Sequence, residues 1–361
     1  MKNSFGNAIN VTVFGESHGA GVGVLIDGIA PGIKVDEDFI AHQLTLRRPS
    51  GKISTARREP DEYVIQSGVY NGFTTGAPLC IFIPNTDTRS RDYTPDLPRP
   101  SHADFTAREK YHGFEDYRGG GHFSGRITAA LVAAGAIVIP ALREKGIYIG
   151  TTIRQIGQLI LGEIDTDSDA LLAIAESDYG LTDEHAIRMM HEIIERAASA
   201  GDSVGGVLET AIVGLPTGLG EPWFDGVESQ IARAVFGIPA VKSVAFGADK
   251  LALLHGSTAN DQFALREGMI VTETNNSGGI LGGITNGMPV IFRSTVKATP
   301  SISRTQKTVN MSTLEEVELN VRGRHDPCIL PRARIVLDSV AALVVADMLT
   351  VRYGSDALTG K

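Results

Sequence analysis

The chain has 361 residues, of which 42% are hydrophobic and 21% charged, and its formal net charge is −9. This composition is typical of a globular protein with one large domain or two smaller ones. The negative charge argues against broad nucleic-acid binding, and two cysteines are too few for a disulfide framework. Because the sequence shows no signal-like N-terminal segment and no run of 18 apolar residues, we expect a cytoplasmic protein without a membrane span.

The first half of the chain contains one predicted strand and one predicted core helix. The apolar segment Leu79–Ile83 predicts a strand. Ser124 is a suitable N-cap for a helix from about Gly125 to Arg143. Apolar side chains cover every side of this helix, which indicates that it is buried.

The second half shows a similar succession of elements. Asp183–Ala200 has the spacing of an amphipathic helix that ends at Gly201, Gly206–Val213 predicts a strand, and Val336–Leu349 predicts a second buried helix. Residues 151–182 give the weakest signal, and we interpret them as a connection between two halves. Strands mixed with buried helices, without regular βαβ alternation, favour an α+β layered fold.

An internal repeat supports the division into halves. The segment 68–78 matches 279–289 at five of eleven positions, and an apolar stretch follows each copy. Two weaker matches flank it in the same order: 15–19 resembles 201–205, and Arg126-Ile127 resembles Arg334-Ile335, each of which opens an apolar run. We therefore predict two homologous halves, about 1–148 and 200–361, packed as one pseudo-symmetric domain (residues 1–361).

The sequence offers cations, not a glycine-rich loop, for binding phosphate. Neither the P-loop pattern nor the G-x-G-x-x-G fingerprint of dinucleotide-binding proteins is present. Arginines and a lysine instead gather in a Gly/Ser/Pro-rich region at 47–52 and 57–58. A guanidinium binds phosphate or carboxylate through two parallel hydrogen bonds. A solvated basic loop is the alternative interpretation of the same spacing.

Three histidines stand in polar turn-like segments, namely His18, His102 and His325, the last directly before Asp326. Histidine transfers protons near neutral pH, although an isolated histidine often has a structural role. His18, His102 and Asp326 could also form a two-histidine, one-carboxylate metal site. No short ligand spacing supports that alternative, and we predict no metal.

Nine segments taken together resemble the chorismate synthase family over nearly the whole chain. They are 14–19 (FGESHG), 57–61 (RREPD), 67–69 (SGV), 99–104 (RPSHAD), 116–121 (DYRGGG), 201–205 (GDSVG), 218–222 (GLGEP), 277–284 (SGGILGGI) and 323–328 (GRHDPC). The resemblance implies a homotetramer whose subunit is a β-α-β sandwich with internal pseudo-symmetry. It also implies the 1,4-anti elimination of phosphate from 5-enolpyruvylshikimate 3-phosphate (EPSP), which gives chorismate, the last common step of the shikimate pathway to aromatic amino acids.

The resemblance implies roles for particular residues. His18 would protonate the departing phosphate, His102 would protonate the flavin, and Asp326 would assist uptake of the C6 proton. The implied substrate anchors are Arg47, Lys52, Arg126 and Arg324. The implied cofactor is reduced FMN, with contacts at Arg47, His122, Phe123, Ser124, Pro239, Ala240, Gly282, Lys297, Ala298, Thr299, Pro300, Ser301 and Arg324.

Two departures from the family pattern affect these roles. Many members have Arg-Ser-Ser-Ala-Arg after the three glycines, where this chain has His122-Phe123-Ser124-Gly125-Arg126. Lys52 stands where arginine is common, which keeps the charge but loses the bidentate fork. The source of reducing equivalents stays open between NADPH used by the chain itself and a separate flavin reductase, and the short chain favours an external reductant.

Two other functions compete with this interpretation. A flavin reductase would need a nicotinamide site, but the dinucleotide fingerprint is absent. A non-catalytic phosphometabolite-binding protein would explain the arginines but not His18, His102 and Asp326.

Overall fold

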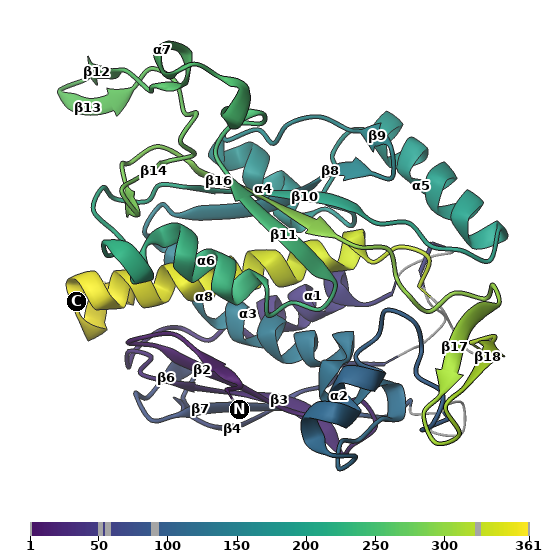
Figure 1. Cartoon of the computed structure of the whole chain (residues 1–361). Coiled ribbons are helices and arrows are strands. Elements are labelled where there is room, and N and C mark those ends of the chain that lie inside the picture. The colour runs from purple at the N-terminus through teal and green to yellow at the C-terminus, as the bar shows by residue number, and fades with distance from the viewer. Residues whose placement is uncertain (1, 50–52, 55–58, 88–93, 322–325, 360–361) are drawn as a thin grey trace.

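Two five-stranded antiparallel sheets enclose a layer of helices (Figure 1). The computed structural model describes residues 2–49, 53–54, 59–87, 94–321 and 326–359. In spatial order, the first sheet contains β1 (Ser4–Phe5), β2 (Asn10–Gly15), β3 (Gly21–Asp27), β7 (Leu79–Pro84) and β4 (Val64–Ser67). The second contains β9 (Leu159–Ile160), β8 (Tyr148–Ile156), β10 (Gly206–Val213), β16 (Val290–Val296) and β11 (Val241–Phe246).

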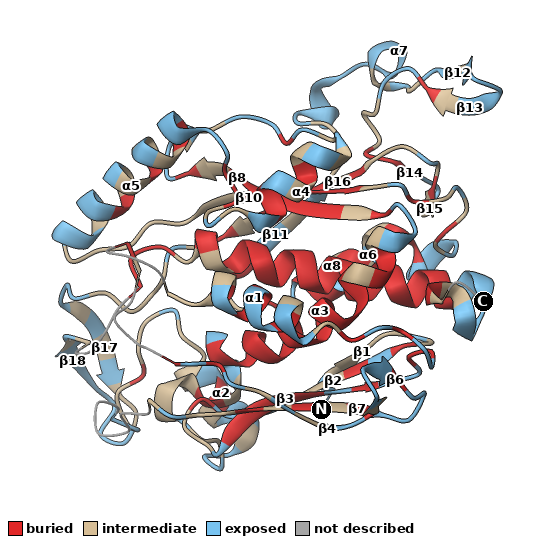
Figure 2. Cartoon of the chain, turned by 180° about the vertical axis from the view of Figure 1, so that it is seen from behind, coloured by how far each residue is buried: buried red, intermediate tan, exposed pale blue. Residues whose placement is uncertain are grey.

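The helices between the sheets form the hydrophobic core (Figure 2). They are α1 (Glu37–Arg47), α3 (Thr128–Glu144), α6 (Val227–Val235) and α8 (Leu330–Tyr353). Outside this layer lie α2 (Asp104–Tyr111), α4 (Ser168–Glu176), α5 (Glu184–Ser199) and α7 (Gly256–Ala259). The predicted β-α-β sandwich of mixed helix and sheet is confirmed.

The two halves repeat the same local contacts. Each contains a short hairpin, β5 (Val69–Tyr70) with β6 (Phe73–Thr74) and β14 (Ile280–Leu281) with β15 (Ile284–Thr285). In the first, Thr74 Oγ1 accepts from the amide of Ile33 and donates to the carbonyl of Ala30. In the second, Thr285 Oγ1 does the same with Leu219 and Pro216. Thr74 and Thr285, which occupy matching positions of segments 68–78 and 279–289, thus hold the two hairpins through the same pair of hydrogen bonds.

The predicted helices and strands are found, but the helix predicted over Val336–Leu349 is longer, because α8 begins at Leu330 and ends at Tyr353. Ser124 caps a short 3₁₀ turn (Gly125–Ile127) that leads into α3. The segment Gly125–Glu144 is apolar and long enough to cross a membrane, but 83% of its most apolar window is buried inside the protein. It is therefore a core helix in this fold.

The interpretation of 151–182 as a mere connection is wrong at its start. Residues 151–156 belong to β8, which pairs with β10 in the middle of the second sheet. The threonines concealed this strand: Thr151 and Thr152 are buried, and their hydroxyls bond to Asp338 and the carbonyl of Gly180. Because Tyr148 already begins a strand of the second sheet, we propose that the second half starts there instead of at residue 200.

Two further hairpins project from the sandwich. The hairpin of β12 (Phe263–Arg266) and β13 (Met269–Thr272) extends away from the second sheet, whereas β17 (Gln306–Asn310) and β18 (Glu315–Leu319) lie beside α2 (Figure 1). Thr308 Oγ1 donates to the carbonyl of Pro98, and the amide of Met311 donates to that of Asp96. The second half therefore supports the 95–104 loop of the first.

The closest approach of the two core helices depends on Gly135. A Cβ on this residue of α3 would lie 2.4 Å from Ser339 Cβ of α8. We expect Gly135→Ala to destabilise the protein by about 1–3 kcal/mol, because overpacking outweighs the gain in helix propensity. Urea unfolding would measure the change. Gly256→Ala, where a Cβ would meet nothing within 4 Å, is the control, and equal stability of the two variants would contradict the prediction.

Candidate active site

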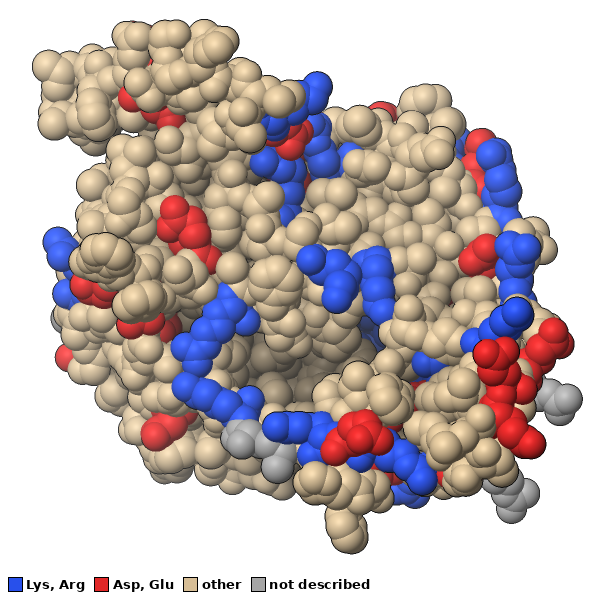
Figure 3. Space-filling view, in the orientation of Figure 1, with Lys and Arg blue, Asp and Glu red and all other residues tan. Residues whose placement is uncertain are grey.

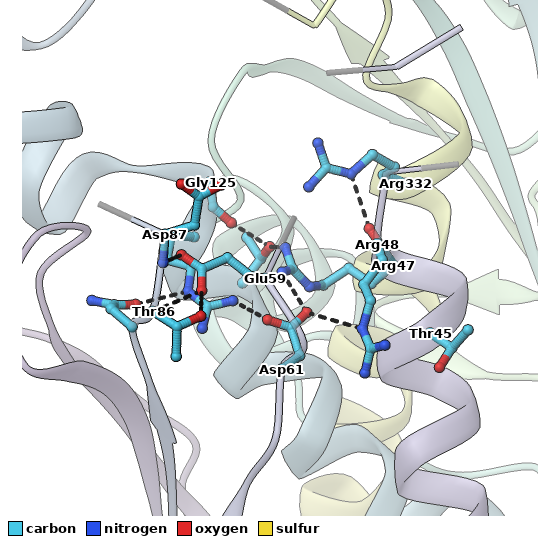
Figure 4. A network of polar contacts seen from close by, with 12 residues as sticks. Thr45, Arg47, Arg48, Glu59, Asp61, Thr86, Asp87, Gly125 and Arg332 are labelled. Atoms are coloured by element: carbon cyan, nitrogen blue, oxygen red, sulfur yellow. Dashed lines mark hydrogen bonds and ion pairs between the residues drawn. The ribbon is translucent and has the colours of Figure 1, made fainter. Parts of the chain in front are cut away.

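A buried carboxylate joins two of the predicted substrate anchors. Arg47 is the last residue of α1, and its Nη2 donates to Asp61 Oδ2 at 3.0 Å. Arg126, in the turn before α3, donates through Nη1 to Asp61 Oδ1. All three residues are at least 95% buried, and Figure 4 shows Asp61 between the arginine side chains. Arg47 and Arg126 hold the pKa of Asp61 below its usual range against the effect of burial.

The same cluster reaches Asp326 through a third arginine. Arg332 Nε donates to the carbonyl of Arg47 at 2.9 Å (Figure 4). Arg332 Nη1 is paired with Asp326 Oδ2. Asp326 is buried near the start of α8. The proposed proton-transfer carboxylate is thus tied to the end of α1, next to a proposed substrate anchor.

On the opposite side the cluster reaches the His18 loop. Arg126 Nε donates to Asn85 Oδ1 at 2.9 Å, and Asn85 Nδ2 donates to the carbonyls of Glu16 and Gly19. The loop around His18 is therefore tied by hydrogen bonds to the arginine cluster.

Several guanidinium groups gather in this part of the protein. Those of Arg47, Arg48, Arg126 and Arg332 lie around the carboxylates of Asp61 and Asp326, and the buried carboxylate of Glu59 belongs to the same network (Figure 4). Burial lowers the pKa of Arg47 to about 10, so it stays charged at neutral pH. Arg47 Nε and Arg48 Nε are buried without a hydrogen-bond partner. Figure 3 shows a hollow bordered largely by lysine and arginine side chains, as an anionic ligand requires.

Glycines allow the protein to pack closely around His18. A Cβ on Gly119 would lie 2.1 Å from the His18 ring. The three glycines 119–121 have φ values of +63°, +81° and +52°, which glycine adopts without steric cost. The amide of Ser17 donates to the carbonyl of Gly121 at 3.0 Å. The glycine triplet thus forms one wall of the His18 site.

His102 is held between the two halves as a neutral ring. Its Nε2 lies 2.8 Å from Ser301 Oγ, and its Nδ1 lies 3.3 Å from the carbonyl of Pro100. Burial, with the neighbouring charges of Arg99 and Lys297, lowers the pKa of His102 to about 4. Since a carbonyl only accepts, Nδ1 carries the proton and Nε2 accepts from the Ser301 hydroxyl.

The structure brings several predicted flavin contacts to His102. Lys297 Nζ donates to the carbonyl of Ser101 at 2.6 Å, and the amide of Lys297 donates to the carbonyl of Ala240, which follows Pro239. Ser203 Oγ donates to the carbonyl of Thr299 at 2.6 Å, which explains the 201–205 motif. Thr299 Oγ1 is buried without a hydrogen-bond partner. An unused hydroxyl in this position fits the polar edge of a flavin.

His122, Phe123 and Ser124 occupy different environments. His122 Nδ1 lies 2.8 Å from the carbonyl of Gly15, and Phe123 stacks edge-on against Tyr111. His122 and Phe123 line a cavity of about 350 Å³ between α2 and the end of β2. Ser124 Oγ accepts from the amide of Arg126. Ser124 therefore holds the backbone of Arg126, a predicted substrate anchor.

Some predicted residues are not brought to this site. Gly282 lies in the turn of the β14–β15 hairpin, and Figures 1 and 2 both place that hairpin on the opposite side of the chain from α2 and the β17–β18 hairpin. Lys52 and Arg324 lie outside the described residues. Among the described residues, no group of three His, Cys, Asp or Glu side chains could hold a metal ion.

The sequence analysis missed three residues that organise the site: Asp61, Asn85 and Arg332. A carboxylate directly after an arginine-rich loop is a natural counter-ion, and this signal could have identified Asp61. Arg332 lies in the first turn of α8, where the helix dipole disfavours a cation. That position indicates a specific anionic partner, which the structure shows to be Asp326.

Comparison with known proteins decides the family. The model of the family described as chorismate synthase matches residues 9–350. The chain belongs to the chorismate synthase family. It is 46% identical to the chorismate synthase of Pyrococcus abyssi (strain GE5 / Orsay) over 96% of this chain and 97% of the relative. For the chorismate synthase of Dehalococcoides mccartyi (strain BAV1), identity is 46% over 98% of each chain.

A solved structure supports the same assignment. It is described as the crystal structure of chorismate synthase and superimposes with a TM-score of 0.77 at 30% identity, covering 98% of this chain and 94% of the other. Members of the chorismate synthase family are lyases, so the chain is assigned as an enzyme of that class.

The environment of His102 gives a pH-dependent prediction. Because its folded-state pKa is about 4 and its ordinary value is 6.5, the unfolded chain binds more protons between these pH values. Its contribution to folding stability should therefore fall as the pH drops from about 6.5 towards 4. An NMR titration of the imidazole would show a neutral ring at pH 5.5. A His102 that titrates near 6.5 in the folded protein, as in the urea-unfolded control, would contradict this.

Proposed function

We propose that this protein converts EPSP to chorismate and phosphate by 1,4-anti elimination, with reduced FMN as cofactor. The observation that carries the proposal is the cluster of four arginines, linked by hydrogen bonds to the His18 loop and to Asp326. A substrate with one phosphate and two carboxylates needs such a concentration of cations.

Arg47 and Arg126 are the proposed substrate anchors among the described residues, and Lys52 and Arg324 are proposed for the same role. Arg47 Nε keeps an unused donor. The partners of Arg126, namely Asn85, Asp61 and the carbonyl of Pro84, fix its guanidinium plane. A fixed guanidinium loses little entropy when it binds an anion, which favours its use as an anchor.

His18 is the proposed acid for the departing phosphate. A phosphate leaves poorly as a trianion, so a proton donor close to guanidinium groups lowers the barrier. Hydrogen bonds from Asn85 Nδ2 to the carbonyls of Glu16 and Gly19 keep the His18 loop at the edge of the arginine cluster. His18 therefore combines an imidazole that can donate a proton with a loop linked through Asn85 to the proposed anchor Arg126.

His102 and Asp326 are the proposed proton-transfer groups on the cofactor side. The neutral His102 ring has its lone pair at Nε2, which accepts a hydrogen bond from the Ser301 hydroxyl. An anionic ligand beside it would raise the low pKa of His102 and let Nε2 take up a proton. Asp326, oriented by Arg332, would hold or receive a proton at its carboxylate.

The residues around His102 fit reduced FMN. Lys297, Ala298, Thr299, Pro300, Ser301, Pro239 and Ala240 would form one side of the site, with Thr299 Oγ1 as an unused hydrogen-bonding group. Arg47, His122, Phe123, Ser124 and Arg324 are proposed further contacts. When bound, the flavin supplies electron chemistry that protein side chains lack.

The proposed assembly is a cytoplasmic homotetramer. Gly282 lies away from the other proposed flavin contacts of its own chain. We therefore propose that Gly282 contacts the flavin bound to a neighbouring subunit of the tetramer. We propose that reduced FMN comes from a separate flavin reductase. An assay with NADPH and oxidised FMN as sole reductant source tests the alternative that the chain reduces its own flavin.

An anaerobic assay tests the activity. Purified protein with EPSP and chemically reduced FMN should form chorismate and free phosphate in equal amounts, followed by absorbance and by phosphate release. Oxidised FMN without a reductant should give no product. Failure of folded protein to form either product with reduced FMN would refute the proposed function.

Variants of the two histidines separate an enzyme from a binding protein. We expect His18→Ala and His102→Ala each to lower kcat about 10²- to 10⁴-fold, the usual contribution of general acid–base catalysis. EPSP binding, measured by calorimetry, should change much less. His185→Ala, at an exposed position on α5, is the control. If His102→Ala had the same kcat as the control His185→Ala, His102 would have no role in the mechanism.

A further inference from the structure

We propose that Asp61 is a positioning residue that fixes Arg47 and Arg126 in the geometry that binds the substrate's anionic groups. This inference rests on the proposed function and names a residue that acts on substrate only through its arginine partners. Among the described residues, Asp61 is the sole carboxylate paired with either arginine. Its Oδ2 faces Arg47 and, at 3.9 Å, Arg48 Nε, whereas its Oδ1 faces Arg126.

The two arginines come from separate elements that Asp61 brings together. Arg47 ends α1 and Arg126 precedes α3. Two guanidinium groups of like charge repel at short distance, most strongly where burial removes the screening by water. The two arginines together carry a charge of +2, and the Asp61 carboxylate lowers the sum to +1. It also gives each guanidinium a fixed acceptor.

The backbone at Asp61 shows that its placement is enforced. Its φ is +51°, a left-handed conformation that most L-residues avoid and that Asp, Asn and Gly tolerate. Its carboxylate is fully buried. Strained conformations of this kind persist where the surrounding structure demands them. Asn and Gly are therefore the substitutions that remove the charge while keeping the backbone.

A positioning role and a simple charge role predict opposite results. If Asp61 only reduced the positive charge, its removal would make the site bind anions more tightly. If it positions the arginines, its removal must weaken substrate binding despite the added positive charge. The direction of the change in KM therefore separates the two roles.

The experiment compares Asp61→Asn and Asp61→Gly with the wild-type enzyme. We expect KM for EPSP to rise at least tenfold in both variants, with a smaller fall in kcat, and the Kd for inorganic phosphate, measured by calorimetry, to rise in parallel. Glycine leaves a space that formate can fill, so 50–100 mM formate, on the order of that needed for a weak ligand, should restore much of the KM of Asp61→Gly. Chloride at equal ionic strength should not.

Asp347→Asn is the matched control. Asp347 is also 2% exposed, and it accepts from the amides of Asn7, Ala8 and Ile9. It lies about 22 Å along α8 from Arg332 at 1.5 Å per residue. It should lose thermal stability with an unchanged KM, which shows that a general loss of stability does not raise KM.

An unchanged or lower KM in folded Asp61→Asn would overturn the inference, as would a Kd for phosphate equal to that of the wild type. If Asp61→Asn does not fold, Asp61→Gly decides alone, because glycine adopts this φ freely. A wild-type protein without turnover would refute the proposed function instead, while the phosphate calorimetry would still test the role of Asp61.

Discussion

The candidate active site depends on one buried carboxylate. Asp61 lies where the end of α1, the turn before α3 and the edge of the first sheet meet, and it pairs with Arg47 of α1 and with Arg126 of that turn. From these arginines, hydrogen bonds lead to Asn85 and the His18 loop in one direction and to Arg332 and Asp326 in the other. Removing a single partner from such a buried network leaves charges without compensation, which is far more costly than losing a surface ion pair.

Matching residues of the predicted internal repeat make different contacts in the two halves. Arg126 and Arg334 occupy matching positions before or within the two core helices, yet Arg334 donates to the carbonyls of Ile174, Ala175 and Ser177. It therefore closes the C-terminal end of α4, where a cation is favourable. Arg126 thus contacts Asp61 and Asn85 in the candidate site, whereas Arg334 makes a structural contact with the end of α4.

Sequence patterns predicted the fold where hydrophobicity was continuous. The helix after Ser124 is a nearly continuous apolar run and was placed closely. The strand 206–213 was also placed closely, although Glu209 and Thr210 interrupt its apolar residues. The strand at 148–156 was missed because Thr151 and Thr152 are polar residues that satisfy their hydroxyls internally. The roles of His18 and His102 came from family resemblance, and the structure adds the contacts that surround them. Asp61 was overlooked because its function depends on two arginines that are 14 and 65 residues away in the sequence.

The contacts between the His102 loop and the C-terminal half have a consequence for folding of the chain during its synthesis on the ribosome. Lys297 and Ser301 contact the His102 loop across 196 and 199 residues, and Thr308 contacts Pro98 across 210. Contacts of such long sequence separation form late in folding. A nascent chain that has completed its first sheet thus holds Arg47 and Arg126 but lacks the C-terminal residues that contact the His102 loop. This loop reaches its final contacts only after Lys297, Ser301 and Thr308 have been synthesised.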